Sequence, residues 1–181
     1  MALGSTIYNF DIALSDIDRG VYEQLVLRVA QHATETLDYM LTRVLAYCLE
    51  WQPRIEFGRG IGDNDDAAVW VRDYDGQIKL WVEVGMPSAE LLHRASKAAE
   101  RCVVYTHRRI DNVMQSLAGR NIYHAADIPI YTFDYGFMNQ FVALVERRMA
   151  FDLSVTEQQI YLTIGERNLH SAITPNAIPV Q

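Results

Sequence analysis

The chain has 181 residues, half of them hydrophobic, and a formal net charge of −7 from 16 Lys and Arg against 23 Asp and Glu. This length is enough for one domain with a hydrophobic core, and the apolar fraction excludes an intrinsically disordered chain. The acidic balance argues against a protein that coats nucleic acid non-specifically, because such proteins need an excess of cations to neutralise phosphates. Lys79 and Lys97 are the only lysines, so nearly all positive charge is carried by arginine.

The cysteines and the N-terminal segment indicate the cellular compartment. Cys48 and Cys102 lie within apolar periodic segments, which predicts buried free thiols in a reducing environment. Residues 1–5 lack the basic and apolar regions of a signal peptide. No apolar run reaches the roughly 18 residues of a membrane helix. We therefore expect a cytoplasmic protein without a membrane partner.

The N-terminal part predicts a hairpin followed by a helix. Apolar residues alternate over 6–14 and again over 22–30, around turn-forming residues at 15–20, which is typical of an antiparallel strand pair. From Thr34 to Trp51 apolar residues then recur every three or four positions, which predicts an amphipathic helix with Thr34 as its N-cap. Glu35 would lie in its first turn, where the helix dipole favours negative charge.

The rest of the chain alternates between short strands and helices. A hairpin turn is expected at residues 73–76, and Ser88 is expected to cap the second helix. The expected strands lie at 54–61, 68–72, 77–84, 102–105, 128–133, 150–155 and 159–164, and the expected helices open at Ser88 and span 109–117 and 137–149.

This order of elements predicts the fold class. After the opening pair it is α-β-β-β-α-β-α-β-α-β-β, which favours an α+β or α/β fold with a mixed β-sheet flanked by helices. We expect a single domain over residues 1–173 and a loose C-terminal tail at 174–181, where two prolines interrupt regular structure.

Acidic residues near two neighbouring strands suggest a metal site. Asp65 and Asp66 end an acidic run, residues 63–66, just before one expected strand, and Glu83 lies in the next. Carboxylates at adjacent strand ends are suitable ligands for Mg²⁺, which polarises a phosphodiester and lowers the pKa of the attacking water. The alternative is a solvated acidic loop, with Glu83 in a structural salt bridge to Arg94 on the following helix. Spacing alone leaves both interpretations open.

The most specific motif is Leu80-Trp81-Val82-Glu83-Val84-Gly85-Met86-Pro87. Together with His32-Ala33-Thr34-Glu35-Thr36 and Phe57-Gly58-Arg59-Gly60, it resembles the YaeQ family of bacterial proteins, and the resemblance covers essentially the whole chain. The fold of that family is similar to the PD-(D/E)XK (restriction-endonuclease-like) nuclease fold. Its α-β-β-β-α-β core agrees with the order expected above.

The resemblance implies roles for four residues. Glu83 matches the second metal-binding acid of the nucleases, and Glu35 matches an acid on the first core helix. Arg94 occupies the basic helix position, with Lys97 one turn further on. An arginine there stabilises charge but is a poor base, because its guanidinium does not release a proton.

Two departures from the nuclease pattern bear on function. Gly85 stands where a lysine follows the second acid, and Ala67-Ala68 stands where the first acid is expected, so Asp66 or Asp65 would have to replace it. The resemblance with these departures implies a non-catalytic binding or regulatory protein with an incomplete metal site. The alternative is a Mg²⁺-dependent nuclease-like phosphodiesterase that uses Glu83, Asp66 and Glu35.

The partner is left open between nucleic acid and an unknown protein. Nucleic-acid binding is compatible with the net charge only if the arginines cluster on one face of the molecule. The arginines concerned are Arg59, Arg72, Arg94, Arg101, Arg108 and Arg109.

Overall fold

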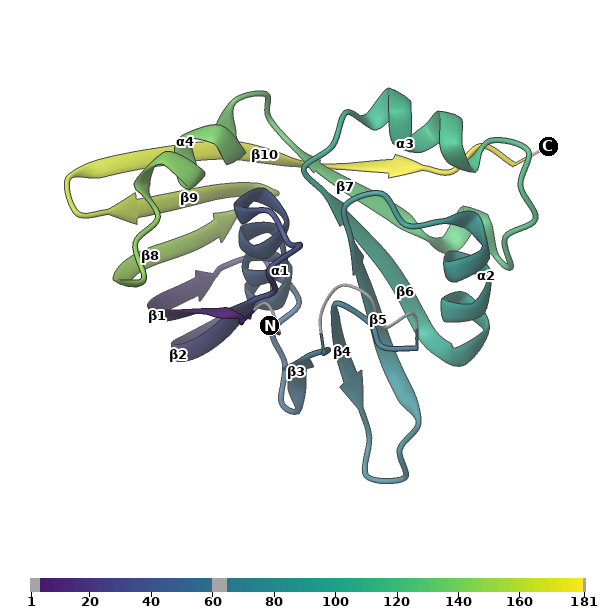
Figure 1. Cartoon of the computed structure of the whole chain (residues 1–181), viewed down its shortest axis with the longest axis horizontal. Coiled ribbons are helices and arrows are strands. Elements are labelled where there is room, and N and C mark those ends of the chain that lie inside the picture. The colour runs from purple at the N-terminus through teal and green to yellow at the C-terminus, as the bar shows by residue number, and fades with distance from the viewer. Residues whose placement is uncertain (1–3, 60–64, 181) are drawn as a thin grey trace. The chain divides into compact units, whose positions relative to one another are not determined.

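The computed structural model describes residues 4–59 and 65–180, which form a mixed α+β fold of ten strands and four α-helices (Figure 1). The chain divides into two compact units. The first comprises residues 1–41 and 133–174, and the second comprises residues 42–132 and 175–181. Helix α1 (Leu37–Leu49) begins in the first unit and ends in the second. The single domain over 1–173 stays a prediction.

The first unit is built on a sheet with the strand order β2-β1-β8-β9-β10. The alternating N-terminal segments form the predicted antiparallel pair β1/β2, and the strands expected at 150–155 and 159–164 pair with each other as the hairpin β8/β9. Strand β1 also pairs in parallel with β8. The strands are β1 (Thr6–Asp16), β2 (Val21–Gln31), β8 (Arg148–Thr156), β9 (Gln159–Ile164) and β10 (Arg167–Ala177).

Helix α4 (Phe137–Leu144) packs on this sheet through aromatic side chains. The Phe151 ring of β8 lies edge-on to Phe141 of α4, with centroids 5.5 Å apart, and to Phe10 of β1 at 6.0 Å. The prediction that this helix runs to Met149 is wrong, because β8 begins at Arg148 and pairs with β1. The long-range strand pairing therefore overrides the local helical periodicity.

Strand β10 is absent from the predicted elements, and residues 174–177 do not form a loose tail. The strand extends through Pro175 to Ala177, and within the second unit the Asn176 amide donates a hydrogen bond of 3.0 Å to the carbonyl of Ile130. Ile178 is buried, with 3% of its surface exposed. Sparse apolar residues and Pro175 conceal this strand in the sequence.

The second unit contains the order α1-β3-β4-β5-α2-β6 that was predicted. Its strands follow the order β7-β6-β5-β4-β3; β3, β4 and β5 pair antiparallel, whereas β5, β6 and β7 pair in parallel. Strand β6 is buried at residues 102–106, as its continuous apolar run predicts. The elements are β3 (Ile55–Phe57), β4 (Val69–Arg72), β5 (Ile78–Val84), α2 (Ala89–Ala98), β6 (Ala99–Thr106), α3 (Ile110–Leu117), a short 3₁₀ helix (Ala125–Asp127) and β7 (Pro129–Phe133).

Helix starts follow the expected capping chemistry with one correction. The Ser88 hydroxyl accepts a hydrogen bond from the Leu91 amide at 3.1 Å, which confirms it as the N-cap of α2. The N-cap prediction for Thr34 is wrong: α1 begins at Leu37, and the Thr36 hydroxyl accepts from the Tyr39 amide at 3.2 Å. Glu35 therefore precedes the helix rather than lying in its first turn.

Other local predictions agree with the structure. The turn at 73–76 joins β4 to β5, with Gly76 at φ 81°. Strand β3 is shorter than expected, and residues 60–64 lie outside the described part of the chain. Cys48 and Cys102 are buried, and neither is part of a disulfide. Among the helices described, none has the length and apolar character needed to cross a membrane.

Candidate functional site

Glu83 lies on the face of β5 that also carries Trp81, because side chains two positions apart in a strand point to the same side. The Trp81 indole Nε1 donates a hydrogen bond of 2.6 Å to Glu83 Oε1. Trp70, opposite Trp81 on β4, packs edge-on against it with ring centroids 5.8 Å apart. Two tryptophans therefore fix the position of this carboxyl group.

The surroundings of Trp81 are apolar. Helices α2 and α3 contribute Leu92, Ala95, Val113 and Leu117 to the cluster of buried side chains that contains both tryptophans. Glu83 is only 5% exposed. Burial raises its pKa to about 7, although the hydrogen bond from Trp81 and the charge of Arg94 act in the opposite direction. Below neutral pH this carboxyl group is therefore protonated.

The two acids predicted to complete a metal site contact arginines. Asp66 Oδ2 accepts a hydrogen bond of 3.1 Å from the Arg59 amide and lies 3.4 Å from the Arg59 Nε. Asp65 is 87% exposed at its side chain, and its Oδ1 lies 3.3 Å from Arg94 Nη1. Asp63 lies outside the described residues.

These residues do not fit a divalent cation. Mg²⁺ needs several charged or carbonyl oxygens directed at one point. Burial raises the pKa of Glu83 to about 7 and its Oε1 accepts from Trp81, while Asp65 and Asp66 lie against guanidinium groups. In residues 4–59 and 65–180, no group of three or more His, Cys, Asp and Glu side chains is arranged to bind a metal ion.

Glu35 and Lys97 lie in other local environments. Glu35, in the first unit, is buried, and its Oε2 accepts a hydrogen bond of 2.9 Å from the His32 amide, closing the turn before α1. Lys97 ends α2 in the second unit and lies over the Tyr123 ring, 5.8 Å from its centroid. Neither contact is one that a catalytic acid or base requires.

Gly85 has a backbone reason for its identity. Its φ of 84° lies in the left-handed region, and its amide donates to the Tyr105 carbonyl at 2.9 Å where β5 ends. A glycine adopts this conformation without steric cost, whereas a lysine does not. The position that holds lysine in the nuclease pattern thus has, in this protein, a left-handed backbone conformation that favours glycine.

We expect Gly85→Ala to lower the free energy of unfolding by about 1–2 kcal/mol, because a Cβ in the left-handed region clashes with the following carbonyl. Chemical denaturation followed by circular dichroism measures the change. Gly4→Ala is the control, since no atom lies within 4 Å of the Cβ it would introduce. Equal stability of the two variants would contradict the backbone explanation.

Five of the six arginines considered for nucleic-acid binding contact acidic residues. Arg59 and Arg94 contact Asp66 and Asp65, as described above, and Arg72 pairs with Glu56 at 2.7 Å. The remaining two are the pairs Arg101–Glu50 at 2.5 Å and Arg109–Asp111 at 4.0 Å. These contacts reduce the positive charge available to a phosphate backbone.

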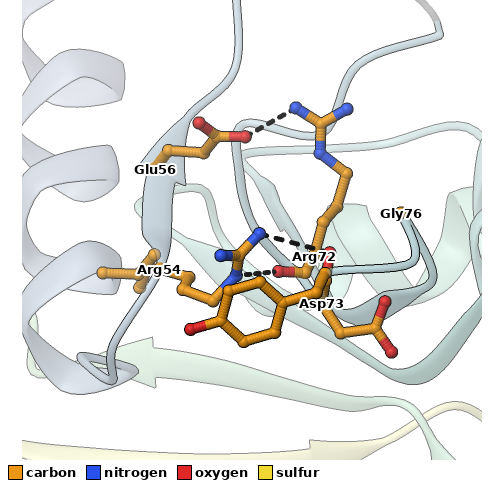
Figure 2. A pocket seen from close by; sticks show the side chains of 7 residues that line it. Arg54, Glu56, Arg72, Asp73 and Gly76 are labelled. Carbon is orange, nitrogen blue, oxygen red and sulfur yellow. Dashed lines mark hydrogen bonds and ion pairs between the residues drawn. The ribbon is translucent and has the colours of Figure 1, made fainter.

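A cleft of about 510 Å³ lies between β3 and the β4–β5 turn (Figure 2). Arg54 Nε and Nη2 donate to the carbonyls of Arg72 and Asp73 at 2.8 and 3.2 Å. Its guanidinium carbon lies 4.1 Å from the centroid of the Tyr74 ring, and Tyr74 is 90% exposed. In the described part of the chain no carboxylate pairs with Arg54. The cleft therefore presents a fixed cation and an exposed aromatic ring.

The sequence analysis did not single out this cleft. Arg54 has a φ of 73°, unusual for a residue other than glycine, and nothing in the sequence signals it beyond its place after Pro53. Tyr74 is visible only as a turn residue. Such strained positions occur often at functional sites, but they also serve structural turns.

A second feature missed from sequence is a buried ionic network. Glu50, 6% exposed, accepts hydrogen bonds from Arg101 Nη1 and Nη2 at 2.5 and 3.1 Å and from the Tyr105 hydroxyl at 2.8 Å. Burial and the charge of Glu50 raise the pKa of Tyr105. Three donors thus satisfy the buried Glu50 carboxylate, so the network is structural in character.

Comparison with known proteins identifies the family. The family model described as "YaeQ protein" matches residues 1–173. Proteins named "Uncharacterized protein YaeQ" from Salmonella typhi and Escherichia coli (strain K12) are each 26% identical over 175 residues, covering 96% of this chain and 97% of theirs.

Solved structures agree with this assignment. The crystal structure of YaeQ protein from Pseudomonas syringae matches with a TM-score of 0.85 and 27% identity, over 94% of this chain and 95% of that one. That of YaeQ protein from Xanthomonas axonopodis pv. citri matches with a TM-score of 0.83 and 27% identity, over 97% and 99%. The chain belongs to the YaeQ protein family.

Proposed function

We propose that this protein is a non-catalytic binding protein that has a nuclease-like core but lacks phosphodiesterase chemistry. The order α1-β3-β4-β5-α2-β6 supports the nuclease-like part of the proposal. The absence of phosphodiester cleavage is inferred from the burial of the Glu83 carboxyl group and its hydrogen bond from Trp81.

A metal-binding carboxylate has to be ionised and directed at the ion. Glu83 is instead buried among apolar side chains, accepts from Trp81 and has a pKa raised to about 7 by burial. Gly85 and Ala67 occupy the positions of the nuclease lysine and first acid, and neither has a functional side chain. These three features together favour a carboxyl group that stabilises the fold.

Cleavage assays test this part directly. Purified protein is incubated with single-stranded and duplex DNA and RNA in Mg²⁺ or Mn²⁺, beside Glu83→Gln and the exposed-site control Glu166→Gln. We expect no cleavage by any of the three. Cleavage by the wild type and Glu166→Gln that is lost in Glu83→Gln would overturn the proposal and establish the metal-dependent alternative.

The ligand site that we propose is the cleft of Arg54, Arg72 and Tyr74. An anionic group bonds there to the outer edge of the Arg54 guanidinium, which Tyr74 and two backbone carbonyls hold in place. A planar ring stacks on the exposed face of Tyr74. A nucleotide, free or within a single strand, carries both groups. Because Glu56 and Asp73 also line the cleft, its ligand can carry only a few negative charges.

We expect Tyr74→Ala to weaken nucleotide binding by about 5- to 150-fold, since one stacked base contributes about 1–3 kcal/mol. Calorimetric titration measures the binding. The probes are a nucleoside monophosphate, a short single-stranded oligonucleotide and inorganic phosphate, which distinguish a free nucleotide from a nucleic-acid strand and from phosphate alone. The control is Tyr135→Ala, because Tyr135 is an exposed tyrosine of the first unit. If no probe binds, or if both variants lose binding equally, the cleft is not the ligand site.

A further inference from the structure

Strand β2 is a long open edge. It stands at the end of the strand order, and its 11 residues pair only with β1 among the strands of the described chain. On its other side no strand of residues 4–59 and 65–180 pairs with β2, so this side is an open sheet edge. Such an edge is a template for pairing with another strand.

The edge also has little of the usual protection against pairing, since Glu23 and Arg28 are its only charged side chains. Natural edge strands carry proline, lysine or a bulge that prevents a second strand from adding. The segment Val21–Gln31 contains no proline, glycine or lysine, and its register with β1 runs without a bulge. Its solvent face instead carries Tyr22 and Val26, which are 63% and 80% exposed.

We propose that β2 pairs antiparallel with β2 of a second copy of this chain, with the two-fold axis passing beside Val26. In an antiparallel pair, residues directly opposite each other point to the same face. This register places Val26 opposite the partner's Val26 on the solvent face. Leu25, which faces the core, then lies opposite the partner's Leu27, and the two apolar patterns coincide.

Charge complementarity supports the same register. Gln24 lies opposite the partner's Arg28, and the Gln24 amide donates a hydrogen bond to the Asp11 carboxylate on β1. Within the described residues, the exposed Arg28 forms no ion pair. Pairing brings each Arg28 toward the Gln24–Asp11 pair of the other copy, and the two-fold axis makes this contact twice. A second copy thus supplies backbone hydrogen-bond partners for β2 and a carboxylate, Asp11, close to Arg28.

The oligomeric state tests the proposal. Light scattering coupled to size-exclusion chromatography should give the wild type about twice the 20.7 kDa of one chain. Val26→Lys and Val26→Glu should each be monomeric, because like charges then lie opposite each other across the axis. An equimolar mixture of the two variants should restore the dimer. Because Val26 is 80% exposed, both variants are expected to fold, and circular dichroism checks this.

Cross-linking tests the register. Opposite residues in an antiparallel pair have Cα atoms about 4.5–5.5 Å apart, which suits a disulfide. Val26→Cys should form a covalent dimer on mild oxidation, whereas the control Thr163→Cys, exposed on β9, should not. The native cysteines are buried. A monomeric wild type, or a dimer that survives Val26→Lys and is not cross-linked by Val26→Cys, would overturn the proposal.

Discussion

The free energy of unfolding of Glu83→Gln, measured relative to the wild type, is expected to be about 2–3 kcal/mol higher at about pH 8 than at about pH 4. Burial raises the pKa of Glu83 in the folded protein to about 7, from its ordinary value of 4.5. The folded state therefore holds a proton that the unfolded state has released between these two values. In that window the stability of the wild type falls as the pH rises, and the glutamine variant lacks this loss.

Urea denaturation across the pH range measures the difference in free energy of unfolding between the wild type and Glu83→Gln. Taking this difference cancels the contribution of the titrating groups that the two proteins share. The control is Glu166→Gln, which removes one carboxyl group at an exposed turn residue. If the stability of Glu83→Gln relative to the wild type did not rise between about pH 4 and about pH 8, the ionised carboxylate would have a partner in the folded protein, and the proposed structural role would be wrong.

Gly58→Ala is expected to destabilise the protein by about 3 kcal/mol, because it forces two backbone segments apart. A Cβ at this position would lie 1.8 Å from the Ala67 carbonyl oxygen. The Gly58 amide donates to the Ala68 carbonyl at 3.1 Å, so the approach of these segments is part of the sheet. Relief of the clash also displaces Asp66 from Arg59.

The free energy of unfolding in urea measures this effect, with Gly4→Ala as the control for the loss of backbone freedom that any Gly→Ala change causes in the unfolded chain. An unchanged midpoint for Gly58→Ala would mean that the close approach of residues 58 and 67 is not required. The motif Phe57-Gly58-Arg59 would then need a functional rather than a packing explanation.

Local pattern was sufficient for most elements of the fold. The alternation in β1 and β2, the helical repeat of α1 and the turn at 73–76 each depend on neighbouring residues, and all three are confirmed. The errors concern long-range pairing. Met149 continues a helical pattern yet lies in β8, which pairs with β1, and β10 has too few apolar residues to be recognised.

The candidate site could be predicted only in part, because its contacts also join residues that are distant in the sequence. For Glu83 the sequence left open a metal ion or a salt bridge to Arg94, whereas the donor that contacts its carboxyl group is Trp81, two residues earlier on the same strand. The arginine contacts of Asp65 and Asp66 depend on loop geometry, and the placement of Arg54 against Tyr74 depends on a left-handed residue. Neither geometry leaves a periodic signal.

The way the chain is divided between its two units has a consequence for synthesis on the ribosome. The first unit needs both ends of the chain, since Asn9 of β1 lies opposite Arg148 of β8. The hairpin of β1 and β2 therefore emerges early with both of its edges open and remains so until the rest has been translated. During that interval the nascent chain is most exposed to aggregation, and holding chaperones have the longest opportunity to bind it.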